Sequence, residues 1–230
     1  MIPIRDRNPS GVFPYITVGI ICLNVIIFLY ELSLGHQLES FLFQFGVVPA
    51  KITYYSEIPD STVIGAYFPF LSYMFLHGGF LHLIGNMWYF WIFGDNIEDM
   101  LGRFKFIIFY LVCGIGSGVV HFYFNSQSGV PCVGASGAVA GILGAYMVTF
   151  PKARVLVIIP LFIIWQIIEL PAIIVLGFWF LIQFFSGATA ITSIEGGGGV
   201  AWWAHVGGFV LGIILIKVFP KSHHRYLHDG

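Results

Sequence analysis

Long apolar runs with almost no charge limit this chain to very few folds. A helix needs about 20 apolar residues to cross the hydrocarbon core of a bilayer, and several runs here reach or approach that length. Only 9% of the residues are charged, whereas soluble domains carry about 25%. The sequence therefore predicts an all-α polytopic membrane protein. We expect one membrane domain over residues 1–230, embedded in the lipid bilayer, and no soluble domain.

Six runs are predicted to cross the membrane. The segment 35–74 is too apolar for a plain loop, and we expect it to be partly embedded beside the bundle, where protein covers irregular backbone. The apolar stretch 155–185 exceeds one crossing, so its first half is interpreted as an interfacial or tilted lead-in to a span that begins near Pro171. The predicted spans are residues 15–34, 78–94, 106–124, 135–150, 171–187 and 201–219.

The basic residues are divided very unevenly between the loops that this topology creates. If the N-terminus is cytoplasmic, the outer loops hold Lys51 alone, and this asymmetry is typical of a correct orientation. Both termini are then predicted to be cytoplasmic, and the second, fourth and sixth spans all begin at the outer face. The cytoplasmic basic residues would be Arg5, Arg7, Arg103, Lys105, Lys152, Arg154, Lys217, Lys221 and Arg225.

Ser136 stands among small residues, in the sequence Gly134-Ala135-Ser136-Gly137 at the start of an apolar run. Taken alone, these small residues fit close helix packing better than catalysis. In the catalytic alternative, the glycines clear space around a nucleophile, and the N–H groups at the helix N-terminus favour a developing oxyanion. Because polar groups within membrane spans are rare and often functional, Ser136 is a candidate nucleophile.

His205 occupies a similar setting at the start of the last span, next to a face marked by Gly208 and Gly212. A histidine hydrogen-bonded to a neighbouring helix explains it as well as catalysis does. If the sixth span packs on the glycine-rich face of the fourth, however, a neutral imidazole comes within reach of Ser136 and can accept its proton. The sequence offers no carboxylate as a third member, so we expect a dyad rather than a triad, with hydroxyl and imidazole about 2.6–3.5 Å apart.

His82 and Asn86 are four residues apart and therefore share one helical face. Both can donate hydrogen bonds without a net charge, which suits an oxyanion hole; the alternative is a polar clamp between helices. His77 lies about 140° around the helix from His82, which disfavours a shared metal site, and no metal or cofactor is predicted. Glu98 is interpreted as part of a solvated helix end, while Asn24 and Glu169 receive no role, and Glu169 is placed on a helix.

Together these motifs resemble the rhomboid family of intramembrane serine proteases, over about residues 15–219. The resemblance implies a six-helix bundle with a partly embedded first loop, Ser136 as nucleophile, His205 as general base and acid, and oxyanion stabilisation by His82, Asn86 and the Ser136 amide. His77 and Glu98 also match family positions. The motifs are His82-Leu83-Ile84-Gly85-Asn86, Gly134-Ala135-Ser136-Gly137 and Ala204-His205-Val206-Gly207-Gly208 with Gly212.

Two positions depart from the pattern. Many rhomboids carry Trp-Arg in the first loop where this chain has Phe68-Pro69, which removes an arginine anchor from that loop. Some members place a tyrosine four residues after the serine to stack on the histidine. This chain has Ala140 there, so His205 must be oriented in another way.

The sequence thus predicts a serine endopeptidase that cleaves single-span membrane proteins in or near their transmembrane segment. Its partners would be transmembrane substrates rather than nucleic acid, and its location a prokaryotic cytoplasmic membrane. The rival hypothesis is a non-catalytic relative that binds membrane clients. A transporter with a histidine proton relay is less favoured, because the polar residues cluster towards the outer face.

Overall fold

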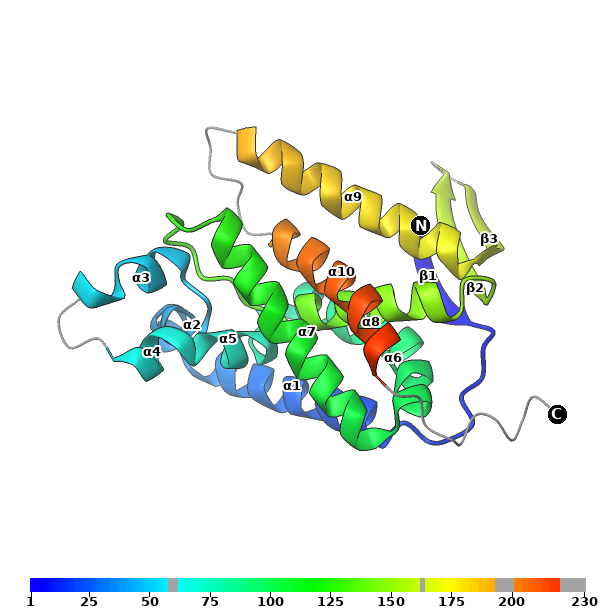
Figure 1. Ribbon diagram of the computed structural model, residues 1–230, viewed down its shortest axis with the longest axis horizontal. Helices are drawn as coiled ribbons and strands as arrows, with labels where there is room; N and C mark the ends of the chain where they lie inside the picture. The colour runs from blue at the N-terminus through cyan, green and yellow to red at the C-terminus, as the bar shows by residue number, and fades with distance from the viewer. Residues whose placement is uncertain (58–61, 162–163, 193–200, 220–230) are drawn as a thin grey trace.

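The computed structural model describes residues 1–57, 62–161, 164–192 and 201–219, and Figure 1 shows a bundle of helices with a small sheet at one end. Lys221 and Arg225, two of the basic residues predicted to be cytoplasmic, lie outside the described residues. Each predicted span overlaps one long helix. These helices are α1 (Tyr15–Ser33), α6 (Phe80–Leu101), α7 (Arg103–Phe124), α8 (Ser136–Thr149), α9 (Ala172–Thr192) and α10 (Trp202–Val218).

The long helices differ in how well they match the thickness of a bilayer. Among the described residues α1, α7 and α9 are long and apolar enough to cross it alone. The segment Val63–Phe75 and α6 pass the same test together, with a bend of 74° between them. Helices α8 and α10 have 14 and 17 residues. Helix length therefore supports three crossings, or four if the bent pair is one span, and the predicted count of six needs another argument.

The segment before α6 is a series of short helices gathered at one end of the bundle (Figure 1). Proline begins two of them, where its missing N–H costs no helical hydrogen bond. Val47 is fully buried and forms an isolated bridge with Cys132, so the segment packs against the bundle at this point. Its depth in a membrane stays a prediction. The helices are α2 (Leu38–Phe45), α3 (Pro49–Thr53), α4 (Val63–Tyr67) and α5 (Pro69–Ser72).

A three-stranded antiparallel sheet lies at the opposite end of the bundle (Figure 1), and there the all-α prediction is wrong. Strand β1 (Ile2–Asp6) pairs with β2 (Arg154–Leu161), which pairs with β3 (Ile164–Pro171). The expected lead-in to the fifth span is therefore a hairpin. A short apolar run fits a strand or a helix, and here the β-branched Val155 and Val157, which share one face of β2, are both fully buried.

Two acidic residues have other surroundings than expected. Glu169 lies on β3 rather than on a helix and forms an ion pair with Arg7. Glu98 is 2% exposed, not solvated: its carboxylate accepts hydrogen bonds from the backbone N–H groups of Ile16 and Thr17, at 2.9 and 2.8 Å. These are orphan donors at the start of α1, which has no side-chain cap of its own, so Glu98 caps that helix from α6.

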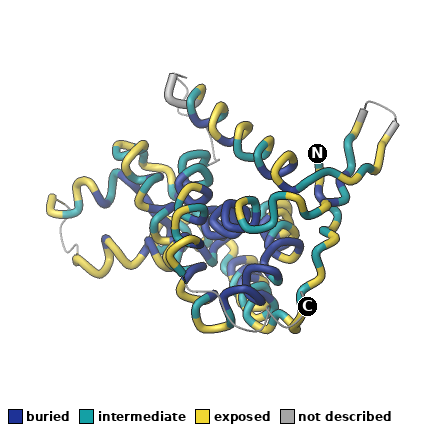
Figure 2. Tube along the Cα trace, turned by 45° about the vertical axis from the view of Figure 1, so that its right-hand side comes forward, coloured by how far each residue is buried: buried dark blue, intermediate teal, exposed yellow. Residues whose placement is uncertain are grey.

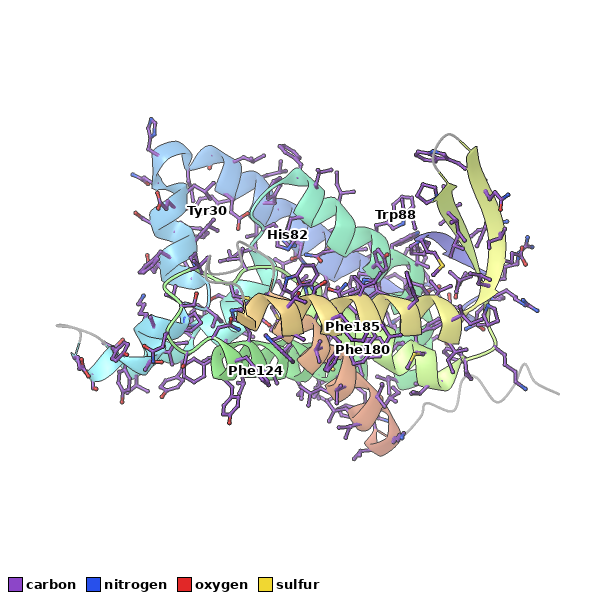
Figure 3. The ribbon with its side chains drawn as sticks, turned by 90° about the horizontal axis from the view of Figure 1, so that it is seen from above. Tyr30, His82, Trp88, Phe124, Phe180 and Phe185 are labelled. Carbon is purple, nitrogen blue, oxygen red and sulfur yellow. The ribbon has the colours of Figure 1, made fainter. Side chains whose placement is uncertain are left out.

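Burial divides the long helices sharply (Figure 2). From Gly137 to Tyr146 every residue of α8 is buried, so this short helix forms the centre of the bundle. Helix α9 is peripheral and exposes large apolar side chains such as Phe178, Leu181 and Phe185. In the view from above, α9 lies over the start of α10 (Figure 3).

Candidate active site

Helices α8 and α10 approach so closely that their backbones touch. A Cβ atom added to Gly212 would collide with the carbonyl oxygen of Gly141, and one added to Gly208 would collide with that of Gly137. Only glycine leaves room for such an approach, which brings small faces of neighbouring helices together. The last span therefore packs on the glycine-rich face, which the sequence analysis named as the condition for the imidazole to reach Ser136.

The helix starts bring Ser136 and His205 together. Ser136 is the first residue of α8, and His205 lies in the first turn of α10. The Ser136 Oγ and His205 Nε2 atoms are 2.8 Å apart, within the range expected from the sequence. Ser136 is partly exposed, although Ala135 and Gly137 on either side are buried.

The other side of the His205 ring faces α9, which the sequence analysis did not anticipate. Its Nδ1 atom lies 2.7 Å from Oε1 of Gln183, a side chain only 7% exposed. One turn earlier, the Trp179 ring lies 5.9 Å from the imidazole centroid at an interplanar angle of 35°. A glutamine within an apolar helix was the available signal, because polar groups in such helices are often functional.

His82 and Asn86, on α6, lie beside the segment that leads into Ser136. Gly134 has φ +127°, and an added Cβ would lie 2.6 Å from His82 Nε2 and 3.5 Å from Asn86 Nδ2, so only glycine fits here. His82 Nδ1 accepts a hydrogen bond from the Gly78 N–H at 3.4 Å, which leaves the ring proton on Nε2. Within the described residues, buried Asn86 Nδ2 has no hydrogen-bond partner.

Of the remaining polar candidates, His77 lies next to this group. The His77 ring is 5.3 Å from that of His82, and the His77 backbone N–H donates to both carboxylate oxygens of Glu31 at 3.2 Å. Asn24 donates within its own helix to the carbonyl of Ile20 at 2.8 Å. The arrangement thus presents a hydroxyl, an imidazole acceptor and two neutral donors around one position, which are the groups that acyl transfer needs.

Comparison with known proteins places this arrangement in context. A family model described as "Rhomboid domain" matches residues 64–222. The mitochondrial presenilin-associated rhomboid-like protein of Rattus norvegicus is 29% identical over 204 residues, which are 85% of this chain and 46% of that protein. The chloroplastic Rhomboid-like protein 11 of Arabidopsis thaliana is 25% identical over 205 residues, 86% of this chain and 66% of that protein. The chain spans less than half the length of the rat protein.

Proposed function

This chain belongs to the rhomboid family, and on that premise we propose that it is an intramembrane serine endopeptidase acting on single-span membrane proteins. The observation that carries the proposal is the 2.8 Å contact between Ser136 Oγ and His205 Nε2 at the starts of two helices in backbone contact. A serine hydroxyl is a weak nucleophile until a base accepts its proton, and a neutral imidazole at this distance is suited to do so.

The reaction proceeds in two halves. Ser136 Oγ attacks the scissile carbonyl carbon while its proton passes to His205 Nε2, and the carbonyl oxygen becomes an oxyanion. Asn86 Nδ2, His82 Nε2 and the Ser136 backbone N–H at the start of α8 donate hydrogen bonds to this oxyanion. His205 then protonates the leaving amine as the C–N bond breaks. Water, deprotonated by His205, releases the acyl group and restores the Ser136 hydroxyl.

We also propose six crossings with both termini cytoplasmic, and the sheet supports this. Paired strands lie on the same side of a bilayer, so the chain between β1 and β2 must cross an even number of times. Helices α1, α6, α7 and α8 lie between them, and without α8 the number would be three. The bridge from Val47 to Cys132 brackets α6 and α7 in the same way. Basic residues on both β1 and β2 favour the cytoplasm for the sheet.

The short α8 can still cross. At 1.5 Å per residue its 14 residues extend about 21 Å, against a hydrocarbon thickness of about 30 Å. Because all residues from Gly137 to Tyr146 are buried in the bundle, protein rather than lipid surrounds most of this helix. The prokaryotic location expected from the sequence stays a prediction, and the relatives named above are described as mitochondrial and chloroplastic.

The proposal is tested by labelling the purified protein with a fluorophosphonate serine-hydrolase probe and by cleavage of a transmembrane substrate. We expect labelling at Ser136, loss of both signals in Ser136→Ala and His205→Ala, and a double variant no worse than either single one, because nucleophile and base act as a unit. Undiminished cleavage by Ser136→Ala would contradict the mechanism. An unlabelled, inactive wild type that still binds membrane proteins would support the non-catalytic alternative.

The oxyanion donors have a separate test. Asn86→Ala should lower kcat by about 10²–10³-fold and leave KM nearly unchanged, because the lost hydrogen bond forms only as charge develops on the substrate. Steady-state cleavage kinetics and thermal unfolding measure the two effects. Full turnover together with a destabilised fold would instead make Asn86 a clamp between helices.

A further inference from the structure

We propose that Gln183 is the positioning residue for His205, holding the imidazole in the one tautomer and orientation that can accept the Ser136 proton. This inference rests on the proposed function of the Ser136–His205 pair. It assigns a structural task to α9, from which the side chain projects. It also supplies a third member that is an amide and not a carboxylate.

The geometry fixes the proton on the ring. His205 has contacts of similar length on both nitrogens: 2.8 Å from Nε2 to Ser136 Oγ, and 2.7 Å from Nδ1 to Gln183 Oε1. A neutral imidazole carries one N–H, and an amide oxygen can only accept a hydrogen bond. The N–H is therefore on Nδ1 and donates to Gln183, which leaves the Nε2 lone pair directed at the Ser136 hydroxyl. In the opposite tautomer Nε2 would carry the ring proton and could not accept the proton of the Ser136 hydroxyl.

Burial makes this contact specific. Gln183 is 7% exposed in a helix that is otherwise almost entirely apolar, and a buried amide is costly unless it is hydrogen-bonded. The tilted ring of Trp179, one turn away on the same face of α9, restricts the imidazole further. Ala140, which follows Ser136 by one turn in α8, is fully buried and has no polar group to offer the ring. The orienting contact therefore comes from α9.

An amide suits this environment for a physical reason. A carboxylate at the same place would orient the ring equally well and would stabilise the imidazolium more, but it would bury a charge at low dielectric. The amide keeps the site neutral in the resting state. We therefore expect Gln183 to contribute through orientation, with an effect of about tenfold on the rate, as is typical of one neutral hydrogen bond.

The experiment compares Gln183→Met and Gln183→Glu with the wild type and with a control, Gln166→Met, at an exposed glutamine on β3. Fluorophosphonate labelling is followed as a function of pH, and kcat and KM are measured with a transmembrane substrate. We expect Gln183→Met, which has nearly the same shape but no acceptor, to lower kcat and the labelling rate about tenfold at unchanged KM. The control should behave as wild type.

Gln183→Glu tests the positioning role through the pH dependence of labelling, which would not change if Gln183 only stabilised the fold. The carboxylate keeps the acceptor oxygen, so labelling should exceed that of Gln183→Met. Its negative charge favours the imidazolium, so the acidic limb of the pH–labelling profile should shift to higher pH. If Gln183→Met and Gln183→Glu were both labelled as fast as wild type, with an unshifted pH–labelling profile, the positioning role would be wrong. The protease proposal would remain intact.

The ring proton can be observed without any activity. Nitrogen-15 chemical shifts of His205 should report an Nδ1–H tautomer in the wild type and a changed or mixed tautomer in Gln183→Met. An Nε2–H tautomer in the wild type would refute the inference, whatever the enzyme does. This measurement also covers the case in which wild-type protein is not labelled, which would defeat the proposed function by itself.

Discussion

The two helices that flank His205 are held to α10 by opposite means. On one side α8 meets α10 through glycines, and the backbones touch at Gly141 and Gly212. On the other side α9 meets α10 through rings: Phe180 and Phe209 have centroids 4.8 Å apart, and Trp179 lies 5.9 Å from the same phenylalanine.

This difference separates two structural requirements of the site. Backbone contact allows no adjustment by side-chain rotation, so α8 and α10 set the distance between hydroxyl and imidazole rigidly. Side-chain contact on the α9 side can relax when one group changes, so that interface sets the orientation of the ring. Mutations on the α8 side should therefore abolish function, whereas those on the α9 side should lower it.

The largest effect is expected from Gly212→Ala. The new Cβ would collide with the backbone of α8, so the two helices must separate. Overpacking costs about 1–3 kcal/mol, and a displacement of about 1 Å at a catalytic pair costs about 100-fold in rate. We expect at least that loss in substrate cleavage, together with a lowered unfolding temperature.

The matched control is Gly177→Ala on α9, where an added Cβ meets nothing within 4 Å. It should keep full activity and be as stable as wild type or slightly more so, because alanine favours helix over glycine by up to about 1 kcal/mol. Equal activity of the two alanine variants would remove the distinction between the interfaces.

A smaller effect is expected from Trp179→Leu. The change removes the ring beside His205 and its contact with Phe209 but keeps an apolar side chain. Aromatic pairs contribute about 0.5–1.5 kcal/mol beyond their buried area, which corresponds to roughly 2- to 12-fold in rate if the loss falls on the transition state. Cleavage kinetics measure it. A loss as large as that of Gly212→Ala would mean that the α9 side is as rigid as the α8 side.

The smallest effect concerns the sheet that leads directly into α9. Asp6 on β1 hydrogen-bonds to Tyr146 of α8, and burial raises the pKa of Asp6 to about 6 from 3.8. Because the folded state binds this proton more tightly, protonation stabilises the fold; that contribution is complete below about pH 4 and is lost as the pH rises through about 6. Asp6→Asn mimics the protonated form, so its stability relative to wild type should increase from pH 4 to pH 7.

Thermal unfolding of Asp6→Asn and wild type at the two pH values checks this sign. The expected difference is a few degrees, since 1 kcal/mol corresponds to roughly 2–4 °C for a protein of this size. All other acidic groups are common to both proteins, so the pH dependence of the difference reports on Asp6 and its neighbours. If the difference in unfolding temperature between the two proteins were the same at both pH values, the raised pKa of Asp6 would not contribute to the stability of the fold.

The α8–α10 side could be predicted from the sequence because its signal is local. Glycines at Gly134, Gly137, Gly208 and Gly212 have one steric meaning, and the residues at the helix starts follow from where the apolar runs begin. The contact between Ser136 and His205 was expected for this reason. The exposed and bulky α9 carries no such periodic signal. The role of Gln183 is visible only once α10 places His205 next to it.

The errors had a common physical cause, which is long-range contact. Apolar residues in 154–171 fit strand or helix until a partner strand is known, and that partner begins at Ile2. Glu98 resembles a solvated helix end until the start of α1 is placed against it. Local pattern cannot supply information that comes from residues about 80 or 150 positions away.

The position of β1 has a consequence for the order in which the protein is made. Its residues leave the ribosome well before those of its partner strand, which begins at Arg154. At synthesis rates of about 5–20 residues per second, β1 waits roughly 10–30 s with its edge unpaired. Until then the nascent chain displays an open strand edge, the kind of surface that pairs readily with other chains. Arg5 and Asp6, charged residues within β1, would discourage such pairing during that interval.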